Sequence, residues 1–267
     1  TELGLTGWVT IDNRSGATYE NARLKLVAGD VHRVRRAVPA PRARGDMVSA
    51  LALKSGIEEE PFFEYHLYSM PRRTDLAENQ TKQVELLSAS GVRLEKEYVL
   101  PGGGGNVKRP GYAKPDKEHP LAMLSFRNEE ASGLGAPLPA GVFRFYKEDS
   151  EGMLQFVGED SIDHTAGGEE IVLEAGKVFD ITAERSITDY QVVRKDKEWE
   201  YEGTVTLRNA KKEAVSVKVY DIVSGEWEVV ESTHEAAIES ATSLFFEVPV
   251  PAGGESVLRY RIRTRND

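Results

Sequence analysis

Apolar and polar residues alternate along most of this chain. In the stretch LTGWVTID near the N-terminus, Leu5, Val9 and Ile11 share one parity, whereas Trp8 falls on the other parity among threonines and an aspartate. Successive side chains of a β-strand point to opposite faces of its sheet. The stretch therefore predicts a strand with one buried face and one solvated face, and it places Trp8 on the solvated face.

The same two-residue period recurs between turns marked by Gly, Pro, Asn and Asp. Further strands are expected at 23–27, 63–68, 84–87, 142–146, 154–157, 199–207, 215–222, 227–231, 244–250 and 257–262. Residues 171–181 are expected to form a tight hairpin around a turn at Ala175 and Gly176. A helical period is confined to 47–54 and 235–240. The pattern predicts an all-β fold of two or three antiparallel β-sandwich modules, immunoglobulin-like in character, with very little helix.

Two stretches interrupt this rhythm. Residues 31–46 are basic and rich in Pro and Ala, and residues 101–120 are rich in Gly, Pro and Lys, a composition that favours loops or linkers. We expect an N-terminal β-sandwich module at 1–100 with the long basic loop 31–46, a loop or linker at 101–120, a hairpin-rich β module at 121–186 and a C-terminal immunoglobulin-like β-sandwich at 187–267.

A short internal repeat links the two ends of the chain. GWVTIDN at 7–13 resembles GTVTLRN at 203–209. The matched pairs include Gly7 with Gly203, Val9 with Val205, Thr10 with Thr206 and Asn13 with Asn209. The repeat predicts two related sandwich modules, one near each end.

The repeat also bears on Trp8, because it pairs Trp8 with Thr204, a residue suited to a solvated face. Burial of an indole removes a large apolar area from water and is strongly stabilising. We therefore expect another module, or the loop after Asp30, to cover Trp8. The alternative is that the indole is an exposed platform for a protein partner or a sugar.

Composition narrows the classes of function. The chain has 267 residues and a formal net charge of −10, which disfavours binding of nucleic acid or anionic lipid by the chain as a whole. It contains no cysteine, which excludes disulfides, thiolate nucleophiles and cysteine–zinc sites. No apolar run approaches the ~20 residues that span a bilayer, so no transmembrane segment is expected. The first residue, Thr1, indicates a processed chain or an excised fragment.

Four longer strings resemble a bacterial family. They are LTGWVTIDNRSGATYENARLKLVAGDV, YHLYSMPRRTDLAENQTKQVELL, LPAGVFRFYKEDSEGMLQFVGEDSIDHTAGGEEIVLEAGKVFDITAER and VPAGGESVLRYRIR. They are similar to the C-terminal domain family of unknown function found in mucoidy inhibitor A-like proteins. The resemblance implies an exported protein of the bacterial periplasm or outer envelope, or a secreted one, with a further β-rich segment upstream. It supplies no catalytic residues.

Residue types that carry catalysis or hold metals show no motif spacing. Ser161, Asp163 and His164 are too close in sequence to converge on one face of a strand. The five histidines lack metal-ligand spacing. The carboxylates of 159–170 leave open a calcium site or a solvated acidic loop. We expect no catalytic residues, no other metal site and no cofactor.

These observations favour a non-enzymatic structural or interaction protein of the bacterial envelope or surface. Sandwich edges can add strands from partners, so we expect a protein partner or self-assembly rather than nucleic acid. The alternatives are a carbohydrate-binding module, or a glycan-directed hydrolase that uses a carboxylate pair. Trp8 and Trp227 are the candidate binding residues, because exposed aromatic rings supply contact area to proteins and glycans.

Overall fold

The computed structural model describes residues 2–28, 51–52, 58–62, 65–70, 72–102, 117–195 and 197–265. Within these ranges the chain is nearly all β, with a single short 3₁₀ turn, η1 (Glu130–Ser132), so the predicted all-β class is confirmed. The basic loop 31–46 and residues 103–116 of the expected linker lie outside the described residues. No helix in the described part of the chain is long and apolar enough to cross a membrane.

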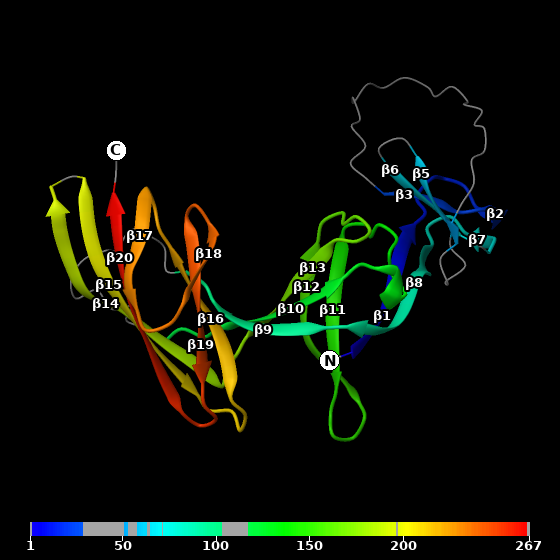
Figure 1. Cartoon of the computed structure of the whole chain (residues 1–267). Helices are drawn as coiled ribbons and strands as arrows, with labels where there is room; N and C mark the ends of the chain where they lie inside the picture. Colours follow the sequence, from blue (N-terminus) through cyan, green and yellow to red (C-terminus); the bar gives the residue numbers. More distant parts are fainter. Residues whose placement is uncertain are drawn as a thin grey trace. The chain divides into compact units, whose positions relative to one another are not determined.

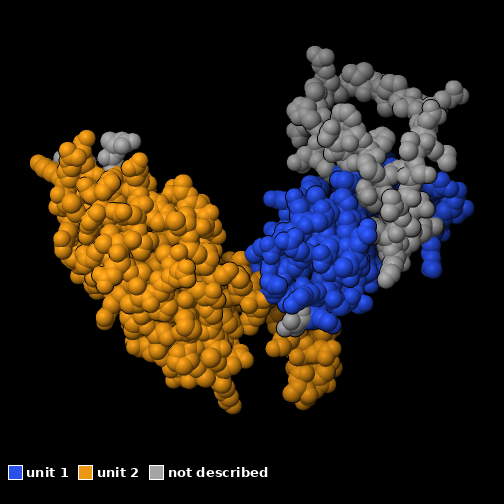
Figure 2. Space-filling view, viewed as in Figure 1, with its two compact units in different colours: residues 1–95, 125–144, 159–173 blue, residues 96–124, 145–158, 174–267 orange. Residues whose placement is uncertain are grey.

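The described residues divide into two compact units (Figure 2). Unit 1 comprises residues 1–95, 125–144 and 159–173, and unit 2 comprises residues 96–124, 145–158 and 174–267. The chain therefore contributes three separate segments to each unit.

Unit 1 is organised around β1 (Glu2–Asp12), which pairs antiparallel with β8 (Thr81–Arg93). The strands between them are β2 (Tyr19–Ala22), β3 (Lys25–Ala28), β4 (Leu51–Ala52), β5 (Glu58–Phe62), β6 (Tyr65–Ser69) and β7 (Thr74–Leu76). β2 pairs with β7, and a four-stranded sheet has the order β3-β6-β5-β4. A small core cluster contains Tyr68, Met70 and Leu86, and Val9 packs against it.

The middle of the chain supplies strands to two sheets. These strands are β9 (Glu95–Leu100), β10 (Leu121–Arg127), β11 (Gly141–Glu148), β12 (Leu154–Ile162) and β13 (Glu170–Lys177). β11 and β12 form a two-stranded sheet. β9, β10 and β13 join a larger sheet together with strands from the C-terminal part of the chain.

The C-terminal part carries the largest core cluster. Its strands are β14 (Ile181–Arg194), β15 (Glu198–Asn209), β16 (Val215–Ile222), β17 (Glu226–Ser232), β18 (Ala236–Ser240), β19 (Ser243–Val250) and β20 (Glu255–Arg265). One sheet has the order β14-β15-β20-β17, and the other has the order β13-β10-β9-β16-β19-β18. Buried side chains of both sheets, including Val205, Leu258 and Phe246, pack into one apolar cluster.

Two local predictions are wrong. Ala175 and Gly176 lie inside β13, because the strand continues through both residues and its neighbour is β10, whereas β14 pairs with β15. Residues 236–240 form the strand β18 and not a helix, because pairing with β19 outweighs a weak local helical preference. Of the second expected helix, 47–54, the described residues are Leu51 and Ala52, which form β4.

One nested pairing occurs three times along the chain (Figure 1). A first strand pairs with a last strand, and two strands between them pair with each other. The pairs are β1–β8 around β3–β6, β10–β13 around β11–β12, and β15–β20 around β16–β19. The three nested copies lie within residues 1–100, 121–186 and 187–267.

A buried asparagine stands at the end of the first strand of each copy: Asn13 and Asn128 directly follow β1 and β10, and Asn209 is the last residue of β15. The side-chain amide N–H groups of Asn209 donate to the carbonyls of Glu213, Val250 and Pro251 at 2.8, 3.4 and 3.1 Å. Those of Asn13 donate to Ala17, Leu76 and Ala77, and those of Asn128 donate to Ala136 and Ala166. In each copy the amide ties the loop after the first strand to the turn before the last strand.

Candidate interaction surfaces

Trp8 stands on the solvated face of β1, as the alternation predicts. It lies opposite Glu85 of β8, and 57% of its surface is exposed. Its neighbour Val9 points the other way and packs against the cluster around Tyr68. The indole is therefore not buried in the described structure; the loop after Asp30, one of the two elements expected to cover it, lies outside the described residues.

Trp227 is placed differently. It lies on β17, is half-buried and packs against the core cluster of unit 2. Its indole N–H donates to the carbonyl of Ala241 at 2.7 Å, which satisfies the polar end of the ring. Trp227 therefore anchors β17 to the sandwich, and Trp8 presents the larger exposed ring face. The two indoles belong to different units.

A further apolar surface lies on β11–β12, within the segment 145–158 of unit 2. We call it the hairpin patch, and its members are 49–64% exposed: Tyr146, Met153, Leu154, Phe156 and Val157. The Tyr146 and Phe156 rings meet edge to face with centroids 5.8 Å apart. Because side chains alternate along a strand, Tyr146, Leu154 and Phe156 share one face of the ribbon, and Met153 and Val157 lie on the other. Exposed apolar side chains gathered in this way commonly mark an interaction site.

Sequence reasoning identified these two strands but missed the patch. The available signal was that apolar residues occupy both parities, as in Phe145 and Tyr146 and again in Phe156 and Val157. Neighbouring residues of a strand point to opposite faces, so when only one face is covered, one apolar side chain of each such pair stays exposed to water. Phe145 is half-buried and Tyr146 is exposed, so the neighbouring elements cover one parity of β11.

The inner hairpin of the third copy carries a shielded ring pair. The Tyr220 and Phe245 centroids lie 5.2 Å apart on β16 and β19, and both residues are half-buried. The ammonium of Lys218 lies 5.3 Å from the Phe245 centroid, and the Tyr220 hydroxyl donates to Glu239 at 2.9 Å. Burial and this hydrogen bond raise the pKa of Tyr220 to about 12. Strands β9 and β18 also extend both edges of this hairpin.

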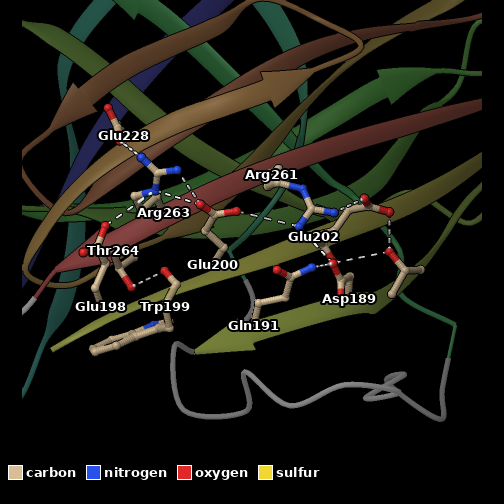
Figure 3. Close-up of polar contacts among 11 residues, drawn as sticks. Asp189, Gln191, Glu198, Trp199, Glu200, Glu202, Glu228, Arg261, Arg263 and Thr264 are labelled. Carbon is tan, nitrogen blue, oxygen red and sulfur yellow. Dashed lines mark hydrogen bonds and ion pairs between the residues drawn. The ribbon is translucent and has the colours of Figure 1, made fainter. Parts of the chain in front are cut away.

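A ladder of arginine–carboxylate pairs covers the outer face of the sheet β14-β15-β20-β17 (Figure 3). Arg261, Arg263 and Arg265 are alternate residues of β20 and therefore share one face. Arg261 contacts Asp189 and Glu202, each at 2.9 Å, Arg263 contacts Glu200 at 2.6 Å and Glu228 at 3.0 Å, and Arg265 contacts Glu198 at 3.3 Å. Each arginine thus bridges to neighbouring strands.

The ladder keeps its members charged. The hydrogen bond from Arg261 holds the pKa of Asp189 below its ordinary value. The hydrogen bond to Glu200 raises the pKa of the Arg263 guanidinium. The hydrogen bond to Asp189 raises the pKa of the Arg261 guanidinium. The carboxylates named above are engaged by guanidinium groups, so the arrangement supports a stiff, mutually neutralised surface.

A polar cluster lies inside unit 2 beneath the sheets. The Tyr201 hydroxyl donates to Asp221 Oδ2 at 2.8 Å, and Tyr260 lies in the same cluster. Arg185 donates to the carbonyls of Tyr220 and Pro101, at 2.9 and 3.0 Å. Burial, with the nearby Asp221 carboxylate, raises the pKa values of both buried tyrosines well above their ordinary range. The cluster joins the segment around Pro101 to the sandwich core.

The remaining candidates for binding chemistry are weaker. Among the described residues, no group of three or more His, Asp or Glu side chains converges as a metal site. Within 159–170, Glu159 pairs with Arg144 at 3.2 Å, and Glu169 accepts the Ala166 N–H at 3.0 Å. An open polar depression of about 470 Å³ in unit 1 is lined by Thr18, Glu20, Asn21, Asp75, Ala77, Gln80 and Lys82.

Comparison with known proteins leaves these surfaces as the basis for any functional statement. No family model, no curated protein and no solved structure matches the chain.

Proposed function

We propose that this chain is a structural or interaction protein of the bacterial envelope or surface, built from immunoglobulin-like β-sandwich modules and acting through protein–protein assembly. The observation that carries the proposal is the hairpin patch. Five large apolar side chains remain about half exposed or more on one two-stranded ribbon. Covering them by a partner removes apolar area from water, which is the main favourable term in protein association.

The contrast within the chain supports this interpretation. The ring pair Tyr220–Phe245 is half-buried and shielded by Lys218 and two added strands, whereas the pair Tyr146–Phe156 is more than half exposed. The same kind of hairpin is therefore completed in one copy and left open in another. An open hairpin is suited to completion by a second polypeptide.

The envelope location in this proposal rests on the resemblance to the C-terminal domain of mucoidy inhibitor A-like proteins. That resemblance covers strings in all three nested copies. It implies an exported or envelope protein with a further β-rich segment upstream.

Photo-crosslinking in cells tests the proposal. A photoreactive amino acid replaces Leu154 in the patch, and in a control it replaces Lys212, an exposed residue of the loop between β15 and β16. We expect protein adducts, identified by mass spectrometry, from position 154 and not from position 212. A second probe replaces Tyr146. Absence of adducts from both position 154 and position 146 would contradict the proposed assembly role.

A carbohydrate-binding role is the second candidate, because Trp8 presents an exposed ring between Thr6 and Thr10 on the solvated face of β1. Stacking of a sugar on the indole would change its fluorescence on titration with oligosaccharides. Trp8→Ala abolishes that response if Trp8 is the platform, and Trp227→Phe leaves it in place. A response that survives Trp8→Ala contradicts this candidate.

A further inference from the structure

We propose that the free edge of β1 is a strand-acceptor site that takes an extended, basic segment of a second protein by antiparallel strand addition. The proposal rests on the assembly role proposed above and deepens it by naming a contact of unit 1 and the chemistry of the segment that binds there. A comparison between the nested copies, the side chains of β1 and the charge of the chain support it.

The first strand of a nested copy has neighbours on both edges in the second and third copies. β10 lies between β9 and β13 in its sheet, and β15 lies between β14 and β20 (Figure 1). In the first copy, β8 is the strand partner of β1 within the described ranges. The other edge of β1 therefore presents N–H and C=O groups that no described strand pairs, and such an edge is a template for strand addition.

The internal repeat shows which strand position is open beside β1. The repeat matches Val9 of β1 with Val205 of β15. Val9 lies opposite Val84 of β8. Val205 lies opposite Leu258 of β20, so β8 takes in the first copy the position that β20 takes in the third. The position of β14, which pairs antiparallel with the other edge of β15, is the one that no described strand takes beside β1.

β1 lacks the features that usually protect an edge strand. It is 11 residues long, it contains neither proline nor lysine, and it carries no charged residue between Glu2 and Asp12. Natural edge strands are commonly short, charged or interrupted by proline, because a long uncharged edge pairs readily with other chains. The pairing of β1 with β8 shifts register before Trp8 and is regular over residues 8–12. We therefore place the acceptor site at residues 8–12.

The side chains of this stretch set the pattern of the added strand. Val9 and Ile11 are half-buried, and Val9 packs against the cluster around Tyr68. Trp8 and Thr10 are exposed on the opposite face. A strand laid along this edge places alternate residues beside these two sets, so it needs apolar side chains on the Val9 face and polar ones beside Trp8.

The charge of the partner segment follows from the chain and from the surroundings of Trp8. The chain has a formal net charge of −10, which attracts basic segments. Glu85 lies opposite Trp8 on β8, is exposed, and contacts no lysine or arginine of the described structure. A lysine of the added strand next to Trp8 lies over the indole in a cation–π contact, with its ammonium toward Glu85.

Binding of a designed peptide to the complete chain tests the proposal. Ser186 of β14 lies opposite Thr204, the match of Trp8. A fluorescein-labelled peptide that copies residues 181–187 therefore brings position 186 next to Trp8. It carries a valine toward Val9 and lysines on the solvated face through the changes Glu184→Lys, Arg185→Val and Ser186→Lys. We expect saturable binding by fluorescence anisotropy, weakened at higher salt.

Hydrogen exchange locates the bound peptide. We expect exchange to slow in β1 and to stay unchanged in β15, whose corresponding edge β14 already occupies. N-methylated peptides show whether backbone pairing carries the binding, since a strand offers the N–H groups of alternate residues to one neighbour. Methylation of one parity is expected to weaken binding about tenfold, whereas methylation of the other parity leaves it nearly unchanged. A peptide with Ser186→Glu is the charge control and binds more weakly.

Absence of saturable binding, slowed exchange in β15 instead of β1, or equal effects of the two methylations overturns the proposal. Slow exchange of β1 amides of both parities before the peptide is added assigns the edge to a segment of the same chain. Protection that rises with chain concentration assigns it to a second copy, and either result overturns the assignment to a second protein. Photo-crosslinking at positions 154 and 146 probes a different surface, so the proposed function is tested independently.

Discussion

Asn209 shows how a single residue holds a module of this chain together. Its side chain is 2% exposed, and its amide joins two turns that lie about forty residues apart, from Glu213 to Val250. Its Oδ1 also accepts the Lys211 N–H at 2.9 Å. The repeat in the sequence matched Asn13 with Asn209, and the structure shows that both make this set of bonds. Asn128 escaped the match because the residues that lead up to it, AMLSFRN, share only the asparagine with GWVTIDN.

Asn209→Ala is expected to destabilise unit 2 by about 1–3 kcal/mol, because it leaves buried carbonyls without a donor. Urea unfolding followed by circular dichroism measures the change. Glu213→Ala is the control, since the bond uses the backbone carbonyl of Glu213 and the exposed side chain takes no part in it. Equal stability of Asn209→Ala and the wild type would show that the amide does not hold the turns.

The pairing of β15 with β20 sets what each position of these strands tolerates. Gly203 lies opposite Tyr260, and a Cβ there would lie 2.6 Å from the Tyr260 hydroxyl oxygen. Tyr260 is buried, and its ring stacks on Phe246 at a centroid distance of 4.8 Å. The same register brings Arg261, Arg263 and Arg265 level with the carboxylates of β15.

Gly203→Ala is expected to cost about 1–3 kcal/mol, because the Tyr260 ring has no free space into which to move. The matched control is Gly7→Ala at the corresponding position of the repeat. There a Cβ would lie 2.9 Å from Cγ of Leu87, a half-buried side chain that is able to shift. We expect chemical denaturation to show the larger loss for Gly203→Ala, and a reversed order would contradict this account.

Arg263→Met is expected to lower the melting temperature of unit 2 by a few degrees at low salt, because it removes contacts to Glu200 and Glu228 together. The loss should shrink in ~1 M NaCl, where the Debye length is about 3 Å. Arg144→Met, which removes an exposed contact to Glu159, serves as the control with a smaller effect. If the decrease in melting temperature is the same at low and high salt, the effect comes from packing of the aliphatic part of the Arg263 side chain and not from its charge.

Whole-molecule stability depends on pH through the buried tyrosines. Burial raises the pKa values of Tyr201 and Tyr260 above the ordinary value of about 10. The unfolded chain therefore binds fewer protons than the folded chain above pH ~10, so the stabilisation is complete below that pH and falls as the pH rises. In the same cluster, the hydrogen bond from the Tyr201 hydroxyl provides a partner for the buried Asp221 carboxylate.

We expect the free energy of unfolding of unit 2 to fall above pH ~10, by up to about 1.4 kcal/mol per pH unit for each buried tyrosine. Tyr201→Phe makes this decline less steep, although it also lowers stability at neutral pH by removing the donor to Asp221. Tyr19→Phe, which removes an exposed hydroxyl, keeps the slope. Urea titrations between pH 8 and pH 12 give the slopes, and identical slopes for Tyr201→Phe and the wild type would contradict the prediction.

The sequence by itself determined that the chain is built of strands and which face of β1 is solvated. This information is local, since side chains alternate every residue whatever the strand pairs with. The placement of Trp8 on the polar parity follows from it directly, whereas its exposure depends on which elements cover that face. The match of Asn13 with Asn209 likewise depends on short stretches whose turns are alike.

Only the tertiary structure decided which strands are partners and which apolar faces remain open. Ala175 and Gly176 resemble a turn in the sequence, but β13 continues through them. Its partner is β10, a strand about fifty residues earlier that the local pattern does not reveal. The exposure of the Tyr146–Phe156 pair, compared with the shielding of Tyr220–Phe245, depends on strands contributed from elsewhere in the chain. Burial is set by what covers a face, and that cover comes from residues distant in sequence.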